Sequence, residues 1–372
     1  MNERRDVIVI GGGIIGLLSA WELAGRGHGV LLVDRRATGR EASWAGGGIL
    51  SPINPHEYPP ALEALCRESA ALYPEIAERV EREAGFSVEL RATGLLRVAF
   101  HGEEEALESV ARSLESRGHA LERIDGDRAR QLEPALSPSI TRALNQREIM
   151  QIRNPRFLRA LAVSAAHRGV EIREHASVSS LEVSGKQVIG ARIDDRLVEA
   201  GEVVLAAGAW SATLMPPQLE ISLPLRPVHG VMVLLERRPP LCSRVIVGRG
   251  RYLIPRVDGR LLAGSTVEER GFDRSVPLGA VASVLEDAIS MAPSISECSW
   301  QRAWSGLRPA AFDRLPFLGR PADVEGLVVA TGHYRNGLLL GAITARIVAQ
   351  LVAGESPGAH AEACRLDRPR FD

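Results

Sequence analysis

Lysine is nearly absent from this sequence. Lys186 is the one lysine among 45 basic residues, and all the others are arginines. A Schiff-base enzyme and a phosphate-binding loop each need a lysine within a functional motif. Lys186 instead lies in the turn-like run VSGKQ at 183–187, so the sequence argues against both kinds of chemistry.

Cysteine and metal-ligand patterns are equally sparse. Cys66, Cys242, Cys298 and Cys364 are far apart, form no CxxC pair and have no histidine at metal-binding spacing. This spacing favours neither a zinc ribbon nor a disulfide framework, and it suits a reducing compartment. The nine histidines form no nucleophile triad. We therefore expect a protein without a metal ion.

The charge balance and the lengths of the apolar runs argue against two kinds of partner. With 45 basic and 46 acidic residues the net charge is -1, so nothing predicts binding to nucleic acid. No stretch reaches the roughly 18 apolar residues that cross a bilayer. Residues 1–5 and the apolar run after them superficially resemble a signal peptide, but glycines interrupt the run and no cleavage pattern follows. We expect a cytoplasmic protein without a membrane span.

What the sequence does contain is a regular alternation of elements. Its 372 residues, 45% of them hydrophobic, predict two packed domains or one large α/β unit. A strand over 6–10, a helix over 13–27 and a strand over 30–33 form an opening βαβ unit. Further helices are predicted over 59–85, where Pro74 is expected to kink or split the helix, and over 103–117, 154–168, 278–291 and 336–352. Strands are predicted near 88–100, 171–172, 178–183, 188–193, 202–206, 231–235, 245–247, 252–255, 260–264 and 327–330.

The order of these blocks predicts the fold class. Strand-rich blocks are interleaved with α/β blocks, which indicates an α/β protein with a Rossmann-type nucleotide-binding domain and an interleaved α+β substrate domain on a mixed, mainly antiparallel sheet. We assign residues 1–52, 145–220 and 300–372 to the nucleotide-binding domain. Residues 53–144 and 221–299 are assigned to the substrate domain.

A glycine fingerprint joins the first strand to the first helix. Gly11, Gly13 and Gly16 match GxGxxG: the first permits a tight turn, the second lets the backbone approach a pyrophosphate, and the third allows close packing of helix on strand. Asp34 follows Gly11 by 23 residues, at the end of the second strand, where a carboxylate accepts hydrogen bonds from a ribose. This register favours a dinucleotide site over an ordinary glycine turn with a surface aspartate, but it serves NAD and FAD alike.

Three later glycine-rich segments bear on that choice. They are REASWAGGGIL at 40–50, VVLAAGAWS at 203–211 and LVVATGHYRNG at 327–337. The last would aim a second helix N-terminus at an anion, which suits the negative charge of a reduced flavin. Each could be an ordinary turn, but together they favour an extended cofactor with two ends. A nicotinamide dehydrogenase would leave them unexplained, so we predict FAD.

With these motifs in place, the sequence resembles the FAD-dependent D-amino acid oxidases, and among them the glycine oxidases that serve synthesis of the thiamine thiazole. The resemblance spans nearly the whole chain and rests on VIVIGGGIIG, REASWAGGGILSP, QIRNPRFL, VVLAAGAWS, RYLIPR, WSGLRP and GHYRNGLLL. Because no cysteine lies between Trp304 and Leu340, we expect the FAD to be noncovalent. The cofactor contacts that motif and resemblance imply are Gly11, Gly13, Ile14, Ile15, Gly16, Asp34, Arg35, Ala42, Ser43, Gly46, Gly47, Gly48, Ile49, Val178, Ala207, Gly208, Trp210, Gly332, His333, Tyr334, Arg335, Asn336, Gly337 and Leu338.

The resemblance also implies how a substrate is held. Arg308 matches the arginine that grips a substrate carboxylate, a group that a guanidinium binds bidentately. Tyr252 matches the tyrosine that supports it, and Arg335 a second arginine at the flavin edge. A solvated arginine, a half-buried strand tyrosine and a plain helix-start arginine are the structural alternatives. Where a histidine is expected near the tyrosine, Gly250 and Arg251 stand instead.

The activity implied is oxidation of glycine and other small amines, such as sarcosine and short D-amino acids. With the carboxylate fixed, the neutral amine would lose hydride to flavin N5, and water would convert the imine to a 2-oxo acid and ammonia or an amine. Positioning suffices here, so no catalytic side chain is assigned. Dioxygen would be reduced to hydrogen peroxide. The alternatives are a D-amino acid dehydrogenase that passes electrons to a quinone or a protein, and a noncatalytic nucleotide-binding scaffold; the preferred amine and homo-oligomerisation stay open.

Overall fold

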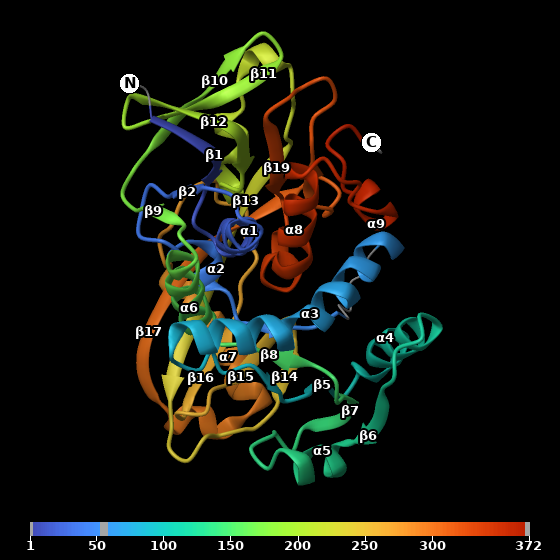
Figure 1. Ribbon diagram of the computed structural model, residues 1–372. Helices are drawn as coiled ribbons and strands as arrows, with labels where there is room; N and C mark the ends of the chain where they lie inside the picture. The colour runs from blue at the N-terminus through green and yellow to red at the C-terminus, as the bar shows by residue number, and fades with distance from the viewer. Residues whose placement is uncertain (1–2, 53–58, 369–372) are drawn as a thin grey trace.

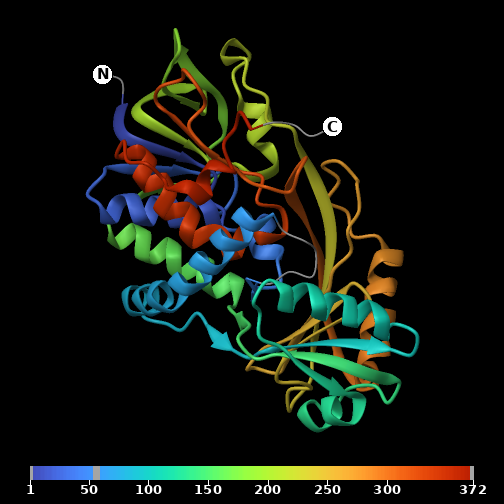
Figure 2. The ribbon, with the colours of Figure 1, turned by 90° about the vertical axis from the view of Figure 1, so that its right-hand side faces the viewer.

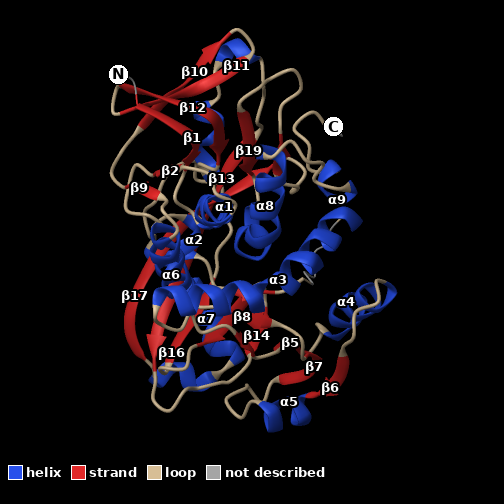
Figure 3. Ribbon diagram, viewed as in Figure 1, coloured by secondary structure: helices blue, strands red, loops and turns tan. Residues whose placement is uncertain are grey.

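The computed structural model describes residues 3–52 and 59–368, so residues 1–2, 53–58 and 369–372 of the predicted domain ranges lie outside the described part. Two large sheets divide the molecule, one in the upper and one in the lower half of Figure 1, with helices packed between and beside them. Helices and strands interleave throughout the chain (Figure 3). The predicted α/β class is confirmed.

The first sheet is built on a parallel core. Its strands are β1 (Glu3–Ile10), β2 (Val30–Val33), β9 (Glu171–Arg173), β10 (Val178–Ser184), β11 (Gln187–Ile193), β12 (Arg196–Leu205), β18 (Phe317–Gly319) and β19 (Leu327–Thr331). β1 lies between β2 and β12 and runs parallel to both. Val7 and Val9 belong to the core on one face and Ile8 and Ile10 to the core on the other, as expected of a strand covered on both sides.

One face of this sheet is covered by helices. They are α1 (Ile14–Gly25), α3 (Pro60–Ala84), α6 (Asn154–His167) and α8 (Gly337–Val352), which share one apolar core. Of the two outcomes predicted for Pro74, a kink or a split of the helix, the split is wrong, because α3 continues through Pro74 as one helix. Tyr73 of α3 donates a hydrogen bond to the Leu338 carbonyl, and Ser69 donates one to the Leu339 carbonyl. The long helix thereby fixes the first turn of α8.

The second sheet is mixed and mainly antiparallel, as predicted. Its strands, in spatial order, are β17 (Ser299–Ala311), β13 (Leu225–Glu236), β16 (Arg260–Gly264), β15 (Arg251–Pro255), β14 (Val245–Gly248), β5 (Leu95–Phe100), β7 (Ile140–Gln146) and β6 (Glu122–Asp125). The β14 and β5 pair is parallel. α4 (Glu104–Ser116), α5 (Gly126–Leu132) and α7 (Leu278–Met291) pack against this sheet.

Short elements complete the fold. They are β3 (Ile49–Leu50), β4 (Arg91–Ala92) and β8 (Met150–Gln151), which form a small third sheet, the helices α2 (Ala42–Ala45) and α9 (Ala359–Glu362), and the 3-10 turns η1 (Gly208–Leu214), η2 (Pro217–Leu219), η3 (Pro293–Glu297) and η4 (Tyr334–Asn336). No helix in the described part of the chain has both the length and the apolarity to cross a membrane.

Two long strands connect the halves. Figure 2 shows β13 and β17 running side by side from the upper to the lower part of the molecule. β17 starts at Ser299 and belongs to the second sheet, although residues from 300 onward were predicted to join the nucleotide-binding domain. The division of the chain into two domains stays a prediction. The strands β13 and β17 and the helix α3 connect the two predicted domains.

Candidate functional site

One cavity of about 990 Å³ is lined by residues of both large sheets. This volume lies at the upper end of the range for small-molecule sites. Of the predicted contacts, all but two line it. The predicted residues that line the cavity are Gly11, Gly13, Ile14, Ile15, Asp34, Arg35, Ala42, Ser43, Gly46, Gly47, Gly48, Ile49, Val178, Ala207, Gly208, Trp210, Tyr252, Arg308, His333, Tyr334, Arg335, Asn336, Gly337 and Leu338.

Gly16 and Gly332 are the two exceptions, and each has a structural reason. A Cβ on Gly16 would lie 1.8 Å from the Gly11 carbonyl oxygen, so its role is close packing of α1 on β1. Gly332 has φ +80° and faces apolar side chains, with Leu225 Cδ2 nearest at 3.2 Å. Both glycines shape the walls behind the cavity.

The first end of the cavity is the β1–α1 turn. Gly11 has φ +106°, and a Cβ there would meet the Ala206 carbonyl oxygen at 2.5 Å. The Ile14 N–H, in the first turn of α1, donates a hydrogen bond to Ser43 Oγ at 2.9 Å. Unpaired N–H groups and the positive end of the helix dipole make such a turn an anion site, which suits a diphosphate.

Asp34 closes the same end. Its Oδ2 accepts a hydrogen bond from the Gly12 N–H at 2.7 Å, and its Oδ1 accepts one from the Arg36 N–H at 2.8 Å. Burial raises the pKa of the Asp34 carboxyl, although these backbone hydrogen bonds oppose the shift. Nearby, the Arg35 guanidinium lies 3.9 Å from the centre of the Trp210 ring. A half-buried carboxylate acceptor at the end of β2 is the arrangement that ribose binding requires.

The glycine run at 46–48 is braced by two side chains that sequence reasoning did not single out as site residues. Asn154, at the start of α6, donates from Nδ2 to the Ser43 carbonyl at 2.8 Å and the Gly46 carbonyl at 3.1 Å. Arg256 donates from Nη2 to the Gly47 carbonyl at 2.8 Å. Both lie in segments that carried the family resemblance, QIRNPRFL and RYLIPR, so their motifs were the available signal.

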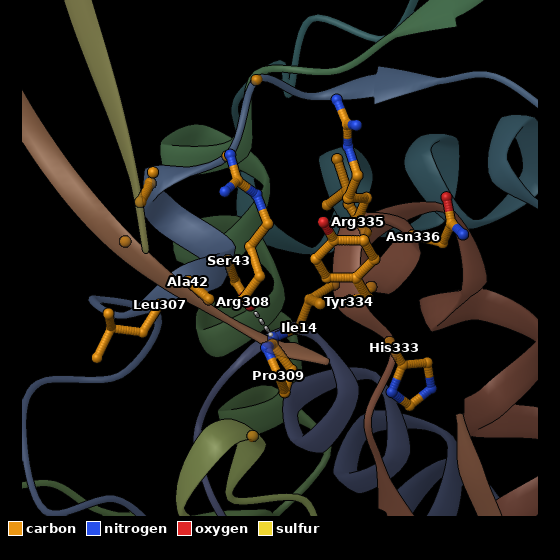
Figure 4. Close-up of a pocket in the computed structure, with 18 of the residues that line it drawn as sticks. Ile14, Ala42, Ser43, Leu307, Arg308, Pro309, His333, Tyr334, Arg335 and Asn336 are labelled. Atoms are coloured by element: carbon orange, nitrogen blue, oxygen red, sulfur yellow. Dashed lines mark hydrogen bonds between the residues drawn. The ribbon is translucent and has the colours of Figure 1, made fainter. Parts of the chain in front are cut away.

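The second end of the cavity is the η4–α8 turn. Figure 4 shows Tyr334 and Arg335 projecting from it beside Arg308. His333 is fully buried there, and its Nε2 lies 3.0 Å from Thr344 Oγ1. Burial lowers the pKa of His333 to about 3, so its imidazole is neutral at physiological pH. It lines the cavity at this turn. In the described residues no cluster of side chains could hold a metal ion.

Arg308 is held over the cavity by neutral groups. It lies on β17, and its Nη2 donates to Ser265 Oγ at 2.6 Å. Its Nη1 donates to the carbonyls of His229 and Thr266, at 3.3 and 3.2 Å. Figure 4 shows its side chain extending along the same side as Arg335. Since no carboxylate among the described residues pairs with Arg308, its charge is free to bind an anionic substrate.

Tyr252 and Arg251 lie side by side on β15 but differ in their partners. The Tyr252 hydroxyl lies 3.3 Å from Met232 Sδ, a weak acceptor that leaves the hydroxyl able to bind a ligand. Arg251 pairs with Asp287 of α7 at 2.9 Å and donates to the Ser265 carbonyl at 2.8 Å. Arg251, which stands where a histidine was expected, therefore supports the loop that holds Arg308.

These residues fit FAD. A Cβ at Gly11 would collide with the Ala206 carbonyl oxygen, so glycine is needed for the β1–α1 turn to form against that backbone, and the N-termini of α1 and α8 both line one cavity. That pairing suits a ligand with a phosphate end and a ring end. None of the described lining residues is a cysteine, which agrees with a cofactor held without a covalent bond.

Comparison with known proteins gives concordant matches. The family model DAO, described as FAD dependent oxidoreductase, matches residues 6–351. The glycine oxidase of Pseudomonas putida is 37% identical over 354 residues, which are 95% of this chain and 96% of that protein. The bifunctional protein ThiO/ThiG of Trichormus variabilis is 33% identical over 353 residues, 94% of this chain and 52% of its own length. The crystal structure of glycine oxidase from Geobacillus kaustophilus matches with a TM-score of 0.94 at 32% identity, covering 99% of this chain and all of that one.

Proposed function

Because this chain belongs to the D-amino acid oxidase family of FAD-dependent oxidoreductases, we propose that it oxidises glycine and other small amines, such as sarcosine and short D-amino acids. The products are a 2-oxo acid, ammonia or an amine, and hydrogen peroxide. The observation that carries the proposal is Arg308, a cation that no carboxylate of the described residues pairs with, in a cavity that fits FAD. As the family resemblance implies, the glycine imine would serve synthesis of the thiamine thiazole.

Binding and orientation are the work of the chain's own residues. Arg308 takes the substrate carboxylate, and Tyr252 supports it from β15. FAD, when bound without a covalent link, supplies the two-electron acceptor for the α-carbon hydride and passes the electrons to dioxygen. Positioning of the reacting carbon lowers the barrier by removing the entropy cost of alignment.

No side chain is required to take a proton from carbon. His333 is the histidine at the ring end of the cavity, and its depressed pKa and its contact with Thr344 make it a poor base. A substrate with a neutral amine can lose hydride directly, because the nitrogen lone pair stabilises the imine that forms. The absence of a basic histidine from this end is therefore consistent with the reaction.

The test is a visible spectrum of the purified holoprotein before and after glycine is added without oxygen. Loss of the flavin band near ~450 nm, followed on aeration by its fast return with peroxide and glyoxylate, supports the oxidase. Bleaching with slow reoxidation in air would instead indicate the dehydrogenase that uses a quinone or a protein. A flavin that glycine, sarcosine and D-alanine all fail to bleach would overturn the proposal.

A further inference from the structure

A second cavity borders the glycine run at 46–48. Its volume is about 1120 Å³, enough for a small organic ligand. Residues of α2, α6, β16 and β17 line it, and Figure 1 shows α2, α6 and β17 together at the left of the molecule. Gly46 lines both this cavity and the one that fits FAD. The two cavities therefore share part of a wall.

Positive charge dominates the described lining of the second cavity, which contains seven arginines and one acidic residue, Glu174. Three of the arginines lie 2.5 to 3.5 Å from Glu89 or Asp258, and these are Arg153, Arg156 and Arg260. The remaining four form no ion pair within the described part of the chain, and they are Arg40, Arg159, Arg256 and Arg302. Because like charges in one concave site repel one another, this lining favours an anionic ligand.

Two of the four unpaired arginines are held against indole rings. The Arg302 guanidinium lies 4.9 Å from the centre of the Trp44 ring and 5.3 Å from that of Trp304. Arg40 lies 6.0 Å from the Trp44 ring centre. A guanidinium over a ring keeps its charge and the N–H donors at its edge. The rings therefore orient these cations without neutralising them.

The other two unpaired arginines also have neutral partners. Arg159 lies 5.2 Å from the ring centre of Phe86. Arg256 is only 6% exposed and donates hydrogen bonds to three neutral oxygens, one of them the Gly47 carbonyl at 2.8 Å. Burial lowers the pKa of Arg256 to about 10, so it is still charged at neutral pH. A buried cation without a carboxylate partner costs free energy that a bound anion would offset.

The arrangement of these cations suits a phosphate group. A phosphate has three terminal oxygens that point in different directions, so it can accept hydrogen bonds from several guanidinium groups at once. A carboxylate has two oxygens in one plane and is matched by a single arginine fork. A concave site also suits a small molecule better than the flatter surface of a folded partner protein.

We propose that the second cavity binds a small phosphate-bearing anion, either a phosphate ester or a diphosphate, and that its occupancy strengthens the binding of FAD. The link is the wall at 45–48, which lines the FAD cavity. From the side of the second cavity, Trp304 donates to the Ala45 carbonyl at 3.1 Å and Arg256 donates to the Gly47 carbonyl. An anion that fixes these two side chains also fixes the wall.

This site is separate from the one that holds the amine substrate, so the inference does not depend on which amine is oxidised. The effect on FAD is a coupling between two binding sites, and such a coupling is reciprocal. FAD should therefore strengthen anion binding by the same factor by which the anion strengthens FAD binding.

The first test measures binding of inorganic pyrophosphate to the holoenzyme by calorimetry, at a constant ionic strength of about 0.15 M so that nonspecific attraction is screened. We expect a Kd below about 1 mM. Arg302→Gln and Arg159→Gln should each raise this Kd by at least about tenfold, and Arg302→Lys should restore part of the loss. Arg79→Gln is the matched control, since Arg79 lies over the Trp21 ring on α3, outside this cavity, and it should change the Kd by less than about twofold.

The choice of anion is tested in the same way. AMP represents a phosphate ester, citrate a carboxylate anion of similar charge, and a short glutamate peptide an acidic protein segment. Tighter binding of AMP than of pyrophosphate would identify an ester as the ligand, and the reverse would identify a diphosphate. Citrate or the glutamate peptide binding as tightly as both phosphates would overturn the proposed ligand class, and so would a pyrophosphate Kd that Arg302→Gln and Arg159→Gln leave unchanged.

The second test measures release of FAD from the diluted holoenzyme, by the rise in fluorescence of the free flavin. Saturating pyrophosphate should slow release from the wild type by at least about fivefold, the lower end of common coupling between sites. It should have little effect on Arg302→Gln, while Arg79→Gln should behave as the wild type. Release at the same rate with and without a bound anion would overturn the coupling. Because neither test uses an amine, failure of the proposed oxidase activity would be seen separately, in the bleaching experiment.

Discussion

At the scale of single residues, the substrate end depends on how Arg308 is held. Its guanidinium donates to one hydroxyl and two carbonyl oxygens, which fix its direction without neutralising its charge. A carboxylate ligand would therefore gain a full ion pair in a partly desolvated place. The same reasoning explains why a lysine, a point charge without a planar fork, would not replace it well.

Replacement of Arg308 by alanine should leave a substrate carboxylate without its partner. We expect a loss of about 2 to 5 kcal/mol in transition-state binding, roughly 30-fold to several thousand-fold in kcat/KM for glycine. Steady-state peroxide assays measure it. Arg226→Ala, at an exposed arginine on β13 that pairs with Glu269, serves as control and should stay within about twofold. Near-native turnover by Arg308→Ala would show that another residue binds the carboxylate.

Gly230 lies beneath Arg308 and leaves room for it. A Cβ there would lie 2.3 Å from Arg308 Nη1 and 2.4 Å from Nη2, so Gly230→Ala should displace the guanidinium and lower kcat/KM by about 10- to 100-fold. Gly279→Ala is the control, because nothing lies within 4 Å of that position. Equal kinetics for the two variants would contradict this placement of Arg308.

At the scale of elements, the helical layer beneath the first sheet is joined by one polar cluster. Glu83 of α3 accepts hydrogen bonds from Ser164 of α6 and from Arg168, which follows α6, while Trp21 of α1 donates to Ser164 at 2.6 Å. The Arg168 guanidinium also lies 3.8 Å from the Trp21 ring centre. Because α1 begins at the phosphate end of the cavity, this cluster fixes the position of the helix whose N-terminus lines that end.

Glu83 makes the stability of this layer depend on pH. Burial raises the pKa of the Glu83 carboxyl, but the hydrogen bonds from Arg168 and Ser164 outweigh burial and lower it to about 2, from an ordinary 4.5. Since the folded state favours the ionised form, its contribution is complete above pH 4.5 and is lost as the pH falls toward 2. Glu83→Gln should cost about 1 to 3 kcal/mol at pH 7 and progressively less below pH 4.5.

Urea unfolding at pH 7, 4.5 and 3 tests this dependence. Glu78→Gln is the matched control, since Glu78 is an exposed residue of the same helix that forms a surface ion pair with Arg82. It should change the free energy of unfolding by less than about 0.5 kcal/mol at every pH. A Glu83→Gln penalty that stays constant from pH 7 to pH 3 would refute the assignment.

At the scale of the whole molecule, the cavity joins the two sheets. Its lining takes the β1–α1 turn and the η4–α8 turn from the first sheet, and β5, β13, β15 and β17 from the second. A cofactor in this place contacts both halves, so binding and folding are linked.

Removal of FAD should therefore lower the melting temperature of the whole protein. Readdition at 100 times Kd should restore about 2.7 kcal/mol, by mass action. ADP, which can occupy only the phosphate end, should stabilise the apoprotein less than FAD at equal ligand concentration, because its fewer contacts give it a larger Kd. Differential scanning fluorimetry with each ligand compares them. An apoprotein that melts at the holoprotein temperature would argue against a cofactor shared by the two sheets.

The sequence by itself determined the parts that depend on neighbours along the chain. The βαβ opening, the glycine turn and Asp34 follow from local periodicity and spacing, and so do the helices at 154–168 and 278–291, which the structure has at Asn154–His167 and Leu278–Met291. Within the motifs at 304–309 and 332–340, residues 306–309 and 333–339 line the cavity, and their binding roles stay predictions. Each of these features is decided by backbone preference and hydrophobic pattern within a few residues.

Only the tertiary structure decided which distant groups meet. The helix α3 continues through Pro74, because its packing against α6 and α8 outweighs the backbone hydrogen bond that proline cannot donate. Residues 299–311 form one long strand beside β13, and Arg256 donates a hydrogen bond to the Gly47 carbonyl. Arg97 lines the cavity, and its Nε has no hydrogen-bond partner among the described residues. These outcomes depend on contacts between residues far apart in the chain, whose partners and desolvation no local pattern encodes.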